Sequence, residues 1–317
     1  DANCAFTMTD YTALITASDN CDNNLSIVQV PAPGTIVSGT TTVDINITDD
    51  AGNTTTCTFN VIVEDNTNPV ITVCADDQTV FVDDNCEIAL ADYTSLVSAT
   101  DNCDLDIELT QVPTAGTIFA GHNTNIPVSI FATDDNGNQV QCDFNVNILD
   151  NTQPTITCPA NLTQSTDLGV CEALVSIPAP VVADNCGIAT VTNDYNGTAD
   201  ATDVYPVGTT TVTWTVTDIA GNTTTCDFDV TVNDTEAPSI TCSADINQTA
   251  DAAVCEAMVT VPAPFTNDNC AVASVVNNYN GTADASDVYP VGTTTVTWTV
   301  TDVAGNSTTC DFNITIT

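Results

Sequence analysis

The sequence predicts an all-β protein built as a tandem array of antiparallel β-sandwiches. Three observations support this class: one segment recurs four times, apolar and polar residues alternate along predicted strands, and turn-forming residues separate these strands without any helical period. The recurring segment reads TDDAGNTTTC (48–57), TDDNGNQVQC (133–142), TDIAGNTTTC (217–226) and TDVAGNSTTC (301–310). A spacing of 84 or 85 residues is long enough for a small domain with a core of its own.

The predicted domain boundaries lie at acidic, polar joints that each end in a proline. These prolines, Pro69, Pro154 and Pro238, open the first strand of the following copy. We therefore predict four repeats, and we expect the first one to be truncated at its N-terminus. Their ranges are 1–66, 67–151, 152–235 and 236–317.

The strand pattern is clearest in the stretch TTTVTWTVTD (209–218). Val212, Trp214 and Val216 alternate with threonines, which predicts a strand with one buried face. CDFDVTV (226–232) and CEALVSI (171–177) continue this pattern, and we expect their cysteines to face inward as well. The tryptophan is thus predicted to be part of the core and not of a sugar-binding platform.

The charge of the chain excludes several classes of function. With 42 acidic residues and no Lys or Arg, the net charge of −42 would repel nucleic acids and anionic membranes. No apolar run approaches the length of a membrane span. One histidine, His122, is the sole nitrogen base among the side chains, and the acids recur in register with the repeat, so we predict that the protein is not an enzyme.

The cysteines indicate an oxidising, extracellular setting. There are 15 of them without any CxxC motif, which favours a disulfide framework over zinc sites.

Several motifs resemble the HYR (hyalin repeat) domain, an immunoglobulin-like extracellular module. They are DxxxPxIxC at the joint, DNC within the copy, and YPVGTTTVTWTVTDIAGNTTTCDF at 205–228. The resemblance covers all four copies, although copies one and two lack the YPVG start and the tryptophan. It implies a tandem array of immunoglobulin-like antiparallel β-sandwiches, stapled by disulfides. Tandem near-copies rich in Thr, Asp and Asn further resemble very long cell-surface and gliding-motility adhesins of Bacteroidetes, which implies cell adhesion or a surface filament.

Four cysteines per copy allow three disulfide connectivities. HYR domains with two cysteines keep the first and fourth positions, and both positions have inward parity here, so we favour first with fourth and second with third. The predicted bonds are Cys74–Cys142, Cys158–Cys226, Cys242–Cys310, Cys4–Cys21, Cys86–Cys103, Cys171–Cys186 and Cys255–Cys270. Cys57 is expected to be unpaired because its partner would precede residue 1.

Oxygen ligands are predicted to converge at each joint. In an end-to-end array the TDxxGN turn, the DNC segment and the last acid of the preceding copy share one end, and such clusters suit calcium. The predicted ligands are Asp65, Asp101, Asn102, Asp134 and Asp135 at the first joint, Asp150, Asp184, Asn185 and Asp218 at the second, and Asp234, Asp268, Asn269 and Asp302 at the third. The alternative is that these acids are solvated turn residues, with Gly221 taking a positive φ in a simple hairpin.

The predicted function is a structural segment, a stalk or filament shaft, of a large extracellular adhesin, stiffened by disulfides and calcium. The alternative is a multivalent module that binds glycans or proteins. Expected partners are other surface proteins, glycans or copies of the chain itself, with no nucleic acid and no direct membrane insertion.

Overall fold

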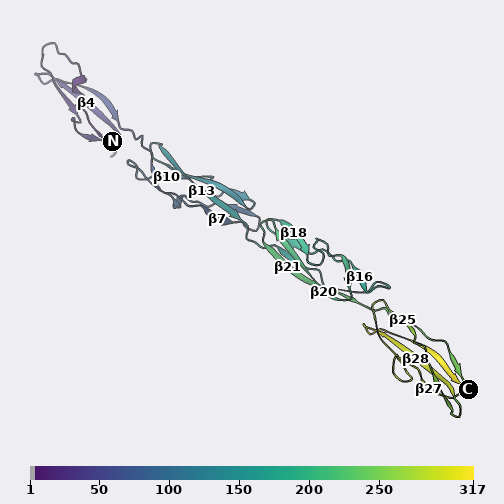
Figure 1. The fold of residues 1–317 in the computed structure, drawn as a ribbon. Coiled ribbons are helices and arrows are strands. Elements are labelled where there is room, and N and C mark those ends of the chain that lie inside the picture. Colours follow the sequence, from purple (N-terminus) through teal and green to yellow (C-terminus); the bar gives the residue numbers. More distant parts are fainter. Residues whose placement is uncertain (1–3) are drawn as a thin grey trace. The chain divides into compact units, whose positions relative to one another are not determined.

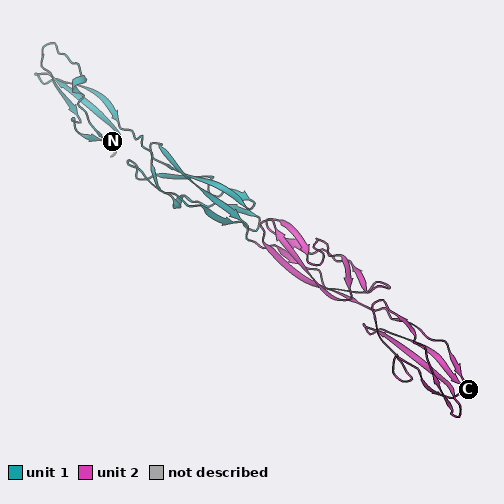
Figure 2. Ribbon diagram, in the orientation of Figure 1, with its two compact units in different colours: residues 1–151 teal, residues 152–317 magenta. Residues whose placement is uncertain are grey.

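The computed structural model describes residues 4–317 as strands and loops, with two short 3-10 turns at Thr12–Leu14 and Thr94–Leu96 (Figure 1). The chain divides into two compact units, residues 1–151 and 152–317 (Figure 2), and each contains two of the predicted repeats. The all-β, immunoglobulin-like sandwich class is thus confirmed. Among the described residues we find no helix with the length and hydropathy needed to cross a membrane.

Repeat 3 shows how one sandwich is organised. Its main sheet has the strand order β15 (Leu162–Ser165), β21 (Thr223–Asn233), β20 (Gly208–Asp218), β18 (Ile188–Asn193). Two further pairs are β14 (Thr155–Thr157) with β17 (Val181–Ala183), and β16 (Glu172–Val175) with β19 (Asp203–Pro206).

The other repeats follow the same plan. In repeat 4 the main sheet is β23 (Ile246–Gln248), β29 (Ser307–Ile316), β28 (Gly292–Asp302), β26 (Val272–Asn277), with β22 (Ser239–Thr241) on β25 (Phe265–Asn267) and β24 (Glu256–Val259) on β27 (Asp287–Pro290). In repeat 2 it is β7 (Gln78–Phe81), β13 (Gln139–Leu149), β12 (Thr124–Thr133), β10 (Glu108–Val112), with β6 (Val70–Val73) on β9 (Ser98–Thr100) and β8 (Glu87–Ala89) on β11 (Ile118–Ala120). Repeat 1 has β2 (Ser26–Val30), β4 (Thr40–Thr48), β5 (Thr54–Ile62), and β1 (Phe6–Thr7) on β3 (Ile36–Val37).

One strand of the main sheet departs from the antiparallel expectation. β15 pairs parallel to β21, and β7 and β23 pair parallel to β13 and β29 in the same way. Parallel neighbours cannot be joined by a tight hairpin, so this strand reaches the edge of the sheet through a long connection. Alternation of side chains does not reveal strand direction, which is why the sequence did not show it.

The core of repeat 3 confirms the predicted strand faces. Val212, Trp214 and Val216 on β20 are all fully buried. Phe228 on β21 and Tyr205 on β19 are buried as well, so the tryptophan, the phenylalanine and this tyrosine all belong to the core. Each such apolar side chain contributes roughly 1.5–3 kcal/mol by leaving water.

Three disulfides lie inside single repeats and join the first cysteine to the fourth. They are Cys74–Cys142, Cys158–Cys226 and Cys242–Cys310. This is the pairing that strand parity and the family resemblance favoured. Each links the loop after the first strand of a repeat to the last strand of the same repeat.

The prediction that the second and third cysteines pair within the same repeat is wrong. Cys4 bonds to Cys103 and Cys171 bonds to Cys270, so each bond crosses a joint to the following repeat. The bonds Cys4–Cys21, Cys86–Cys103, Cys171–Cys186 and Cys255–Cys270 are therefore not formed. Cys21, Cys57 and Cys255 are free and exposed.

The position of the second cysteine explains this error. Cys171 is exposed, not inward as predicted, because it precedes β16 in a loop that faces the linker leaving the repeat. In that loop the backbone N–H of Gly169 donates to the carboxylate of Glu236, which follows the last strand of repeat 3. The cysteine consequently lies beside the next repeat.

Candidate metal centre at the repeat joints

The TDxxGN turn fixes one carboxylate at the start of each joint. In repeat 4, Asp302 ends β28 and its two carboxylate oxygens accept hydrogen bonds from the backbone N–H (2.8 Å) and the side-chain amide (2.9 Å) of Asn306. Burial by itself raises the pKa of Asp302, but the hydrogen bonds from Asn306, Gly305 and Ala304 outweigh it and lower the pKa below its ordinary value. Asp302 is thus buried and ionised at neutral pH.

The linker supplies a second buried carboxylate. Asp234 follows β21 and is 7% exposed. Its Oδ1 accepts hydrogen bonds from the backbone of Glu236 (3.1 Å) and the side-chain amide of Asn269 (3.2 Å). Its Oδ2 is buried and has no hydrogen-bond partner among the described residues.

The DNC segment supplies two further oxygens. Asp268 Oδ2 accepts the backbone N–H groups of Cys270 (2.9 Å) and Ala271 (2.8 Å), whereas its Oδ1 is buried without a partner in the described part of the chain. Asn269 Oδ1 is in the same state. Buried oxygens of this kind cost free energy unless a hydrogen bond or a cation satisfies them.

These groups converge at the third joint. Asp234, Asp268 and Asp302 each offer one carboxylate oxygen, and the three oxygens all lie within 4.8 Å of one another. A point between three such oxygens is at most about 2.8 Å from each, close to the 2.3–2.6 Å that calcium takes to oxygen. Because the chain has no Lys or Arg, no basic side chain other than His122 can neutralise this cluster.

The first joint is less complete. Asp65 and Asp101 lie close together with Cys103, whose sulfur is bonded to Cys4 and offers no thiolate. The backbone N–H of Cys103 lowers the pKa of Asp101. The other three predicted ligands at this joint do not belong to that group: Asp134 is buried with both oxygens bonded inside its own turn, Asp135 is exposed, and Asn102 is exposed with its amide on Cys103 Sγ.

The predicted ligands of the second joint fall on both units and are described within each. Asp150 is 8% exposed and is the residue before the last one of unit 1. In unit 2, Asp218 Oδ1 accepts the N–H groups of Gly221 and Asn222, and Asp184 Oδ2 accepts the N–H groups of Cys186 and Gly187, while Asn185 follows Asp184 in the same DNC segment. Asp218 and Asp184 therefore repeat the local hydrogen bonding of Asp302 and Asp268.

One residue that contributes to the joints was not predicted. The asparagine of TDxxGN bonds to its own aspartate and also donates to a backbone carbonyl of the linker. The bonds from Asn138 to Asp65 O and from Asn306 to Asp234 O reach the preceding repeat. The bond from Asn222 to Thr152 O stays within repeat 3, at its first residue. Its presence in all four copies of the motif was the signal available in the sequence.

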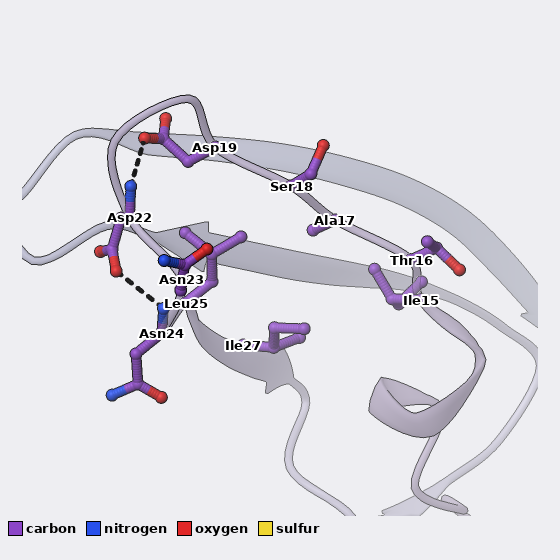
Figure 3. A pocket seen from close by; sticks show the side chains of 10 residues that line it. All are labelled: Ile15, Thr16, Ala17, Ser18, Asp19, Asp22, Asn23, Asn24, Leu25 and Ile27. Carbon is purple, nitrogen blue, oxygen red and sulfur yellow. Dashed lines mark hydrogen bonds between the residues drawn. The ribbon is translucent and has the colours of Figure 1, made fainter.

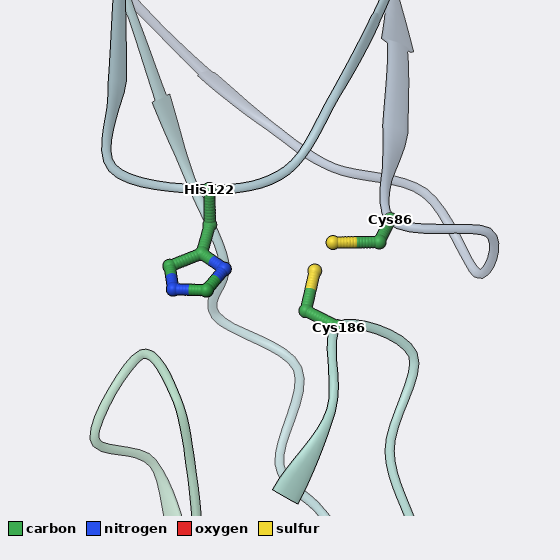
Figure 4. Close-up of side chains that lie close together, drawn as sticks. All are labelled: Cys86, His122 and Cys186. Carbon is green, nitrogen blue, oxygen red and sulfur yellow. The ribbon is translucent and has the colours of Figure 1, made fainter. Parts of the chain in front are cut away.

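Outside the joints, one surface pocket offers a weaker candidate. A surface pocket in repeat 1 is lined by residues between Ile15 and Ile27, where Asp19 and Asp22 accept backbone N–H groups of their own loop (Figure 3). Figure 4 draws Cys86 and His122 of unit 1 with Cys186 of unit 2. Both cysteines are disulfide-bonded, so neither provides a thiolate ligand.

Comparison with known proteins supports the repeat assignment. The HYR domain family matches residues 3–63, 149–232 and 233–316, and a bacterial Ig-like domain (group 3) matches residues 34–106. Most of repeat 2 thus lies outside the HYR matches, although we expected the resemblance to cover all four copies.

Relatives of known name include two sea urchin proteins. Hyalin of Strongylocentrotus purpuratus is 32% identical over 315 residues, covering 95% of this chain and 25% of that protein. Hyalin of Lytechinus variegatus is 30% identical over 310 residues, covering 95% of this chain and 57% of that protein. The chain therefore spans about a quarter and somewhat over half of the lengths of these two relatives.

Similar solved structures include Drosophila N-cadherin EC1-4 (12% identity, TM-score 0.31, 98% of this chain and 96% of that chain) and protocadherin gamma B2 EC1-5 (13%, 0.33, 95% and 72%). We base no conclusion on likenesses this low. The family matches, in contrast, cover more than half of the chain. On that basis the chain belongs to the HYR domain family.

Proposed function

We propose that this chain is a structural repeat segment of an extracellular adhesive assembly, in which disulfides and calcium hold consecutive repeats together. The protein is extracellular or located at the cell surface, in agreement with its HYR repeats and its disulfide-bonded all-β fold. The observation that carries the calcium part is the third joint, where three carboxylates converge and leave buried oxygens without a hydrogen-bond partner among the described residues.

Calcium suits this donor set better than other common cations. Carboxylate, amide and carbonyl oxygens are hard ligands, whereas zinc and copper favour nitrogen and sulfur. Calcium also tolerates irregular coordination, while magnesium demands a near-ideal octahedron. Asp234, Asp268 and Asp302 with the amide oxygen of Asn269 supply four candidate oxygens.

We assign no catalytic activity to the chain. The polar groups at the joints are carboxylates and amides that recur with the repeat, and their hydrogen bonds hold turns in place. The relatives named above are both hyalins.

The partners we propose are other surface proteins or further copies of the chain. A glycan platform on Tyr195 and Tyr279 is less favoured, because Tyr195 stacks on Tyr205 at 4.2 Å and donates its hydroxyl to Val204 O. Tyr279 is engaged in the same way by Tyr289 and Val288. One ring face and the hydroxyl are therefore already used within the domain.

A finer form of the proposal is that such segments form the shaft of a surface filament, as the resemblance of the sequence to gliding-motility adhesins implies. The relatives named above are sea urchin hyalins and do not include such an adhesin. Electron microscopy of the native assembly tests this form. Extended strands with a periodic repeat support it, and compact particles contradict it.

Calcium at the third joint is tested by replacing Asp268 with Asn. The substitution keeps the shape of the side chain but removes one of the three charges, so we expect the chain to bind one calcium ion fewer in isothermal titration calorimetry. A ligand at a free concentration of 100 times its Kd stabilises the folded protein by about 2.7 kcal/mol. The calcium-dependent rise in Tm should therefore become smaller in Asp268→Asn than in the wild type.

The control is Asp311→Asn, which removes the same charge from an exposed position on β29. It should leave both stoichiometry and the calcium effect on Tm unchanged. If excess calcium and chelator give the wild type the same Tm and no heat of binding, the calcium proposal is wrong.

A further inference from the structure

The Cys171–Cys270 disulfide ends next to the oxygens of the third joint. Cys270 directly follows Asp268 and Asn269 in the DNC segment of repeat 4, and Cys171 lies in repeat 3 just before β16. The Cα atoms of the two cysteines are 4.6 Å apart. The bond thus fastens the segment that carries two candidate ligands to the repeat that carries Asp234.

Hydrogen bonds of Asn269 run along the same path as the disulfide. Its amide nitrogen donates to Val170 O (3.1 Å), beside Cys171, and to Asp234 Oδ1 (3.2 Å). Both donor hydrogens are used, so the amide oxygen is turned away from these acceptors, and it is buried without a partner among the described residues. The side chain is held with its oxygen available to a cation.

The loop of repeat 3 that carries Cys171 is itself tied to the linker. Gly169 N–H donates to Glu236 Oε2 (2.9 Å), and Glu236 N–H donates to Asp234 Oδ1 (3.1 Å). The loop, the linker and the DNC segment therefore form one network. The Cys171–Cys270 disulfide links the loop covalently to the DNC segment within this network.

Charge repulsion acts against this network. Three carboxylates whose oxygens lie within 4.8 Å of one another repel, and burial away from water strengthens this repulsion. The net contribution of each hydrogen bond between such loops is small, because water competes for the same donors and acceptors. Without the covalent bond, the DNC segment would move away from Asp234 when no cation is bound.

We propose that the Cys171–Cys270 disulfide is a positioning element for the cation site, so that breaking this single bond lowers the calcium affinity of the third joint without removing any ligand. The inference rests on the proposed function, since it presupposes that the joint binds calcium. It makes cation binding at the joint sensitive to redox conditions. The bond holds Asp268 and Asn269 opposite Asp234, and its loss adds the free energy of reassembly to every binding event.

The test is isothermal titration calorimetry, in which the whole chain is titrated with calcium alone. The third-joint signal is defined as the component that disappears in Asp268→Asn. In the double variant Cys171→Ser/Cys270→Ser, we expect the Kd of this component to rise at least tenfold. Fluorescence of the buried Trp214 and Trp298 verifies that both repeats of unit 2 remain folded.

The matched control is Cys255→Ser. Cys255 occupies the second-cysteine position of repeat 4 but is free, so its replacement should leave the affinity unchanged. If the double variant unfolds, graded reduction of the wild type replaces it, with alkylated peptides reporting which bond has opened. Affinity should then fall in step with opening of Cys171–Cys270.

The outcomes separate the two proposals. A tenfold loss supports the positioning role. An affinity within twofold of wild type, in a folded double variant or after opening of the bond, overturns this inference and leaves the calcium proposal intact. No calcium binding by the wild type overturns both.

Discussion

Tyr205 and Tyr289 make the stability of the folded core depend on pH. Each is fully buried and donates its hydroxyl to a backbone carbonyl, Ala201 O at 2.7 Å or Ala285 O at 2.6 Å. Burial, with neighbouring tyrosines and aspartates, raises the pKa of both side chains from 10.0 to about 12. The folded protein therefore keeps these protons at a pH where the unfolded chain loses them.

Stability should consequently fall with rising pH between about 10 and 12. A raised folded-state pKa contributes stability that is complete below the unfolded pKa and is lost as pH rises towards the folded pKa. We expect the free energy of unfolding of unit 2, measured by urea titration with the free thiols alkylated, to decline across this window.

The variant Tyr205→Phe/Tyr289→Phe should show a flatter pH dependence over the same window. It should also lose about 1 kcal/mol per removed hydrogen bond at pH 8. Equal slopes for variant and wild type would contradict the role of the two hydroxyls.

At the scale of elements, the hairpin between β20 and β21 links the strand pattern to the joint. Gly221 has φ of +98°, the positive value predicted from its place in TDIAGN, and its N–H donates to Asp218 Oδ1 at 2.6 Å. The turn therefore has two roles, reversing the chain and orienting the carboxylate of Asp218.

Gly221→Ala tests the backbone requirement of this turn. No heavy atom lies within 4 Å of an added Cβ, so the cost is conformational strain alone. We expect a loss of about 1–2 kcal/mol in the free energy of unfolding. Thr223→Ala, at the exposed start of β21, is the control and should change stability by less than about 0.5 kcal/mol. A neutral Gly221→Ala would show that the turn readily adopts another conformation.

Some elements were predictable because their signal is local. The alternation of Val212, Trp214 and Val216 with threonines fixes which face of β20 is buried, whatever surrounds it. The parallel pairing of β15 with β21 depends on a long connection, and no short-range pattern in the sequence encodes it.

At the scale of the whole molecule, disulfides join consecutive repeats within both units. Cys4–Cys103 crosses the joint in unit 1 and Cys171–Cys270 crosses the joint in unit 2. Each repeat pair is thus connected by the linker and by a second covalent link. Such a link limits separation of the repeats when the chain is under tension.

Peptide mapping without reduction tests this arrangement. Pepsin digestion at low pH, where thiol exchange is slow, should release peptides that link Cys4 to Cys103 and Cys171 to Cys270. Alkylation before digestion should label Cys21, Cys57 and Cys255. A peptide that links Cys171 to Cys186, or Cys255 to Cys270, would instead support the pairing within repeats.

The candidate site was predictable in its residue types and only partly in its geometry. Repetition of TDxxGN, DNC and an acidic linker indicated that Asp234, Asp268 and Asp302 would meet, and the structure brings them together. The same reasoning placed Asp134 with Asp65 and Asp101, but Asp134 lies outside the group that the structure forms there. Equal spacing in sequence does not ensure equal distances between side chains.

Periodicity, composition and repetition in the sequence were sufficient for the all-β class, the repeat unit, the buried strand faces and the acidic character of the joints, because each is a local or additive property. The partners of the second and third cysteines and the closeness of the joint carboxylates depended on the tertiary structure. They require groups from two repeats to approach in space, and only the folded packing of a loop such as 166–171 against the next repeat brings them together.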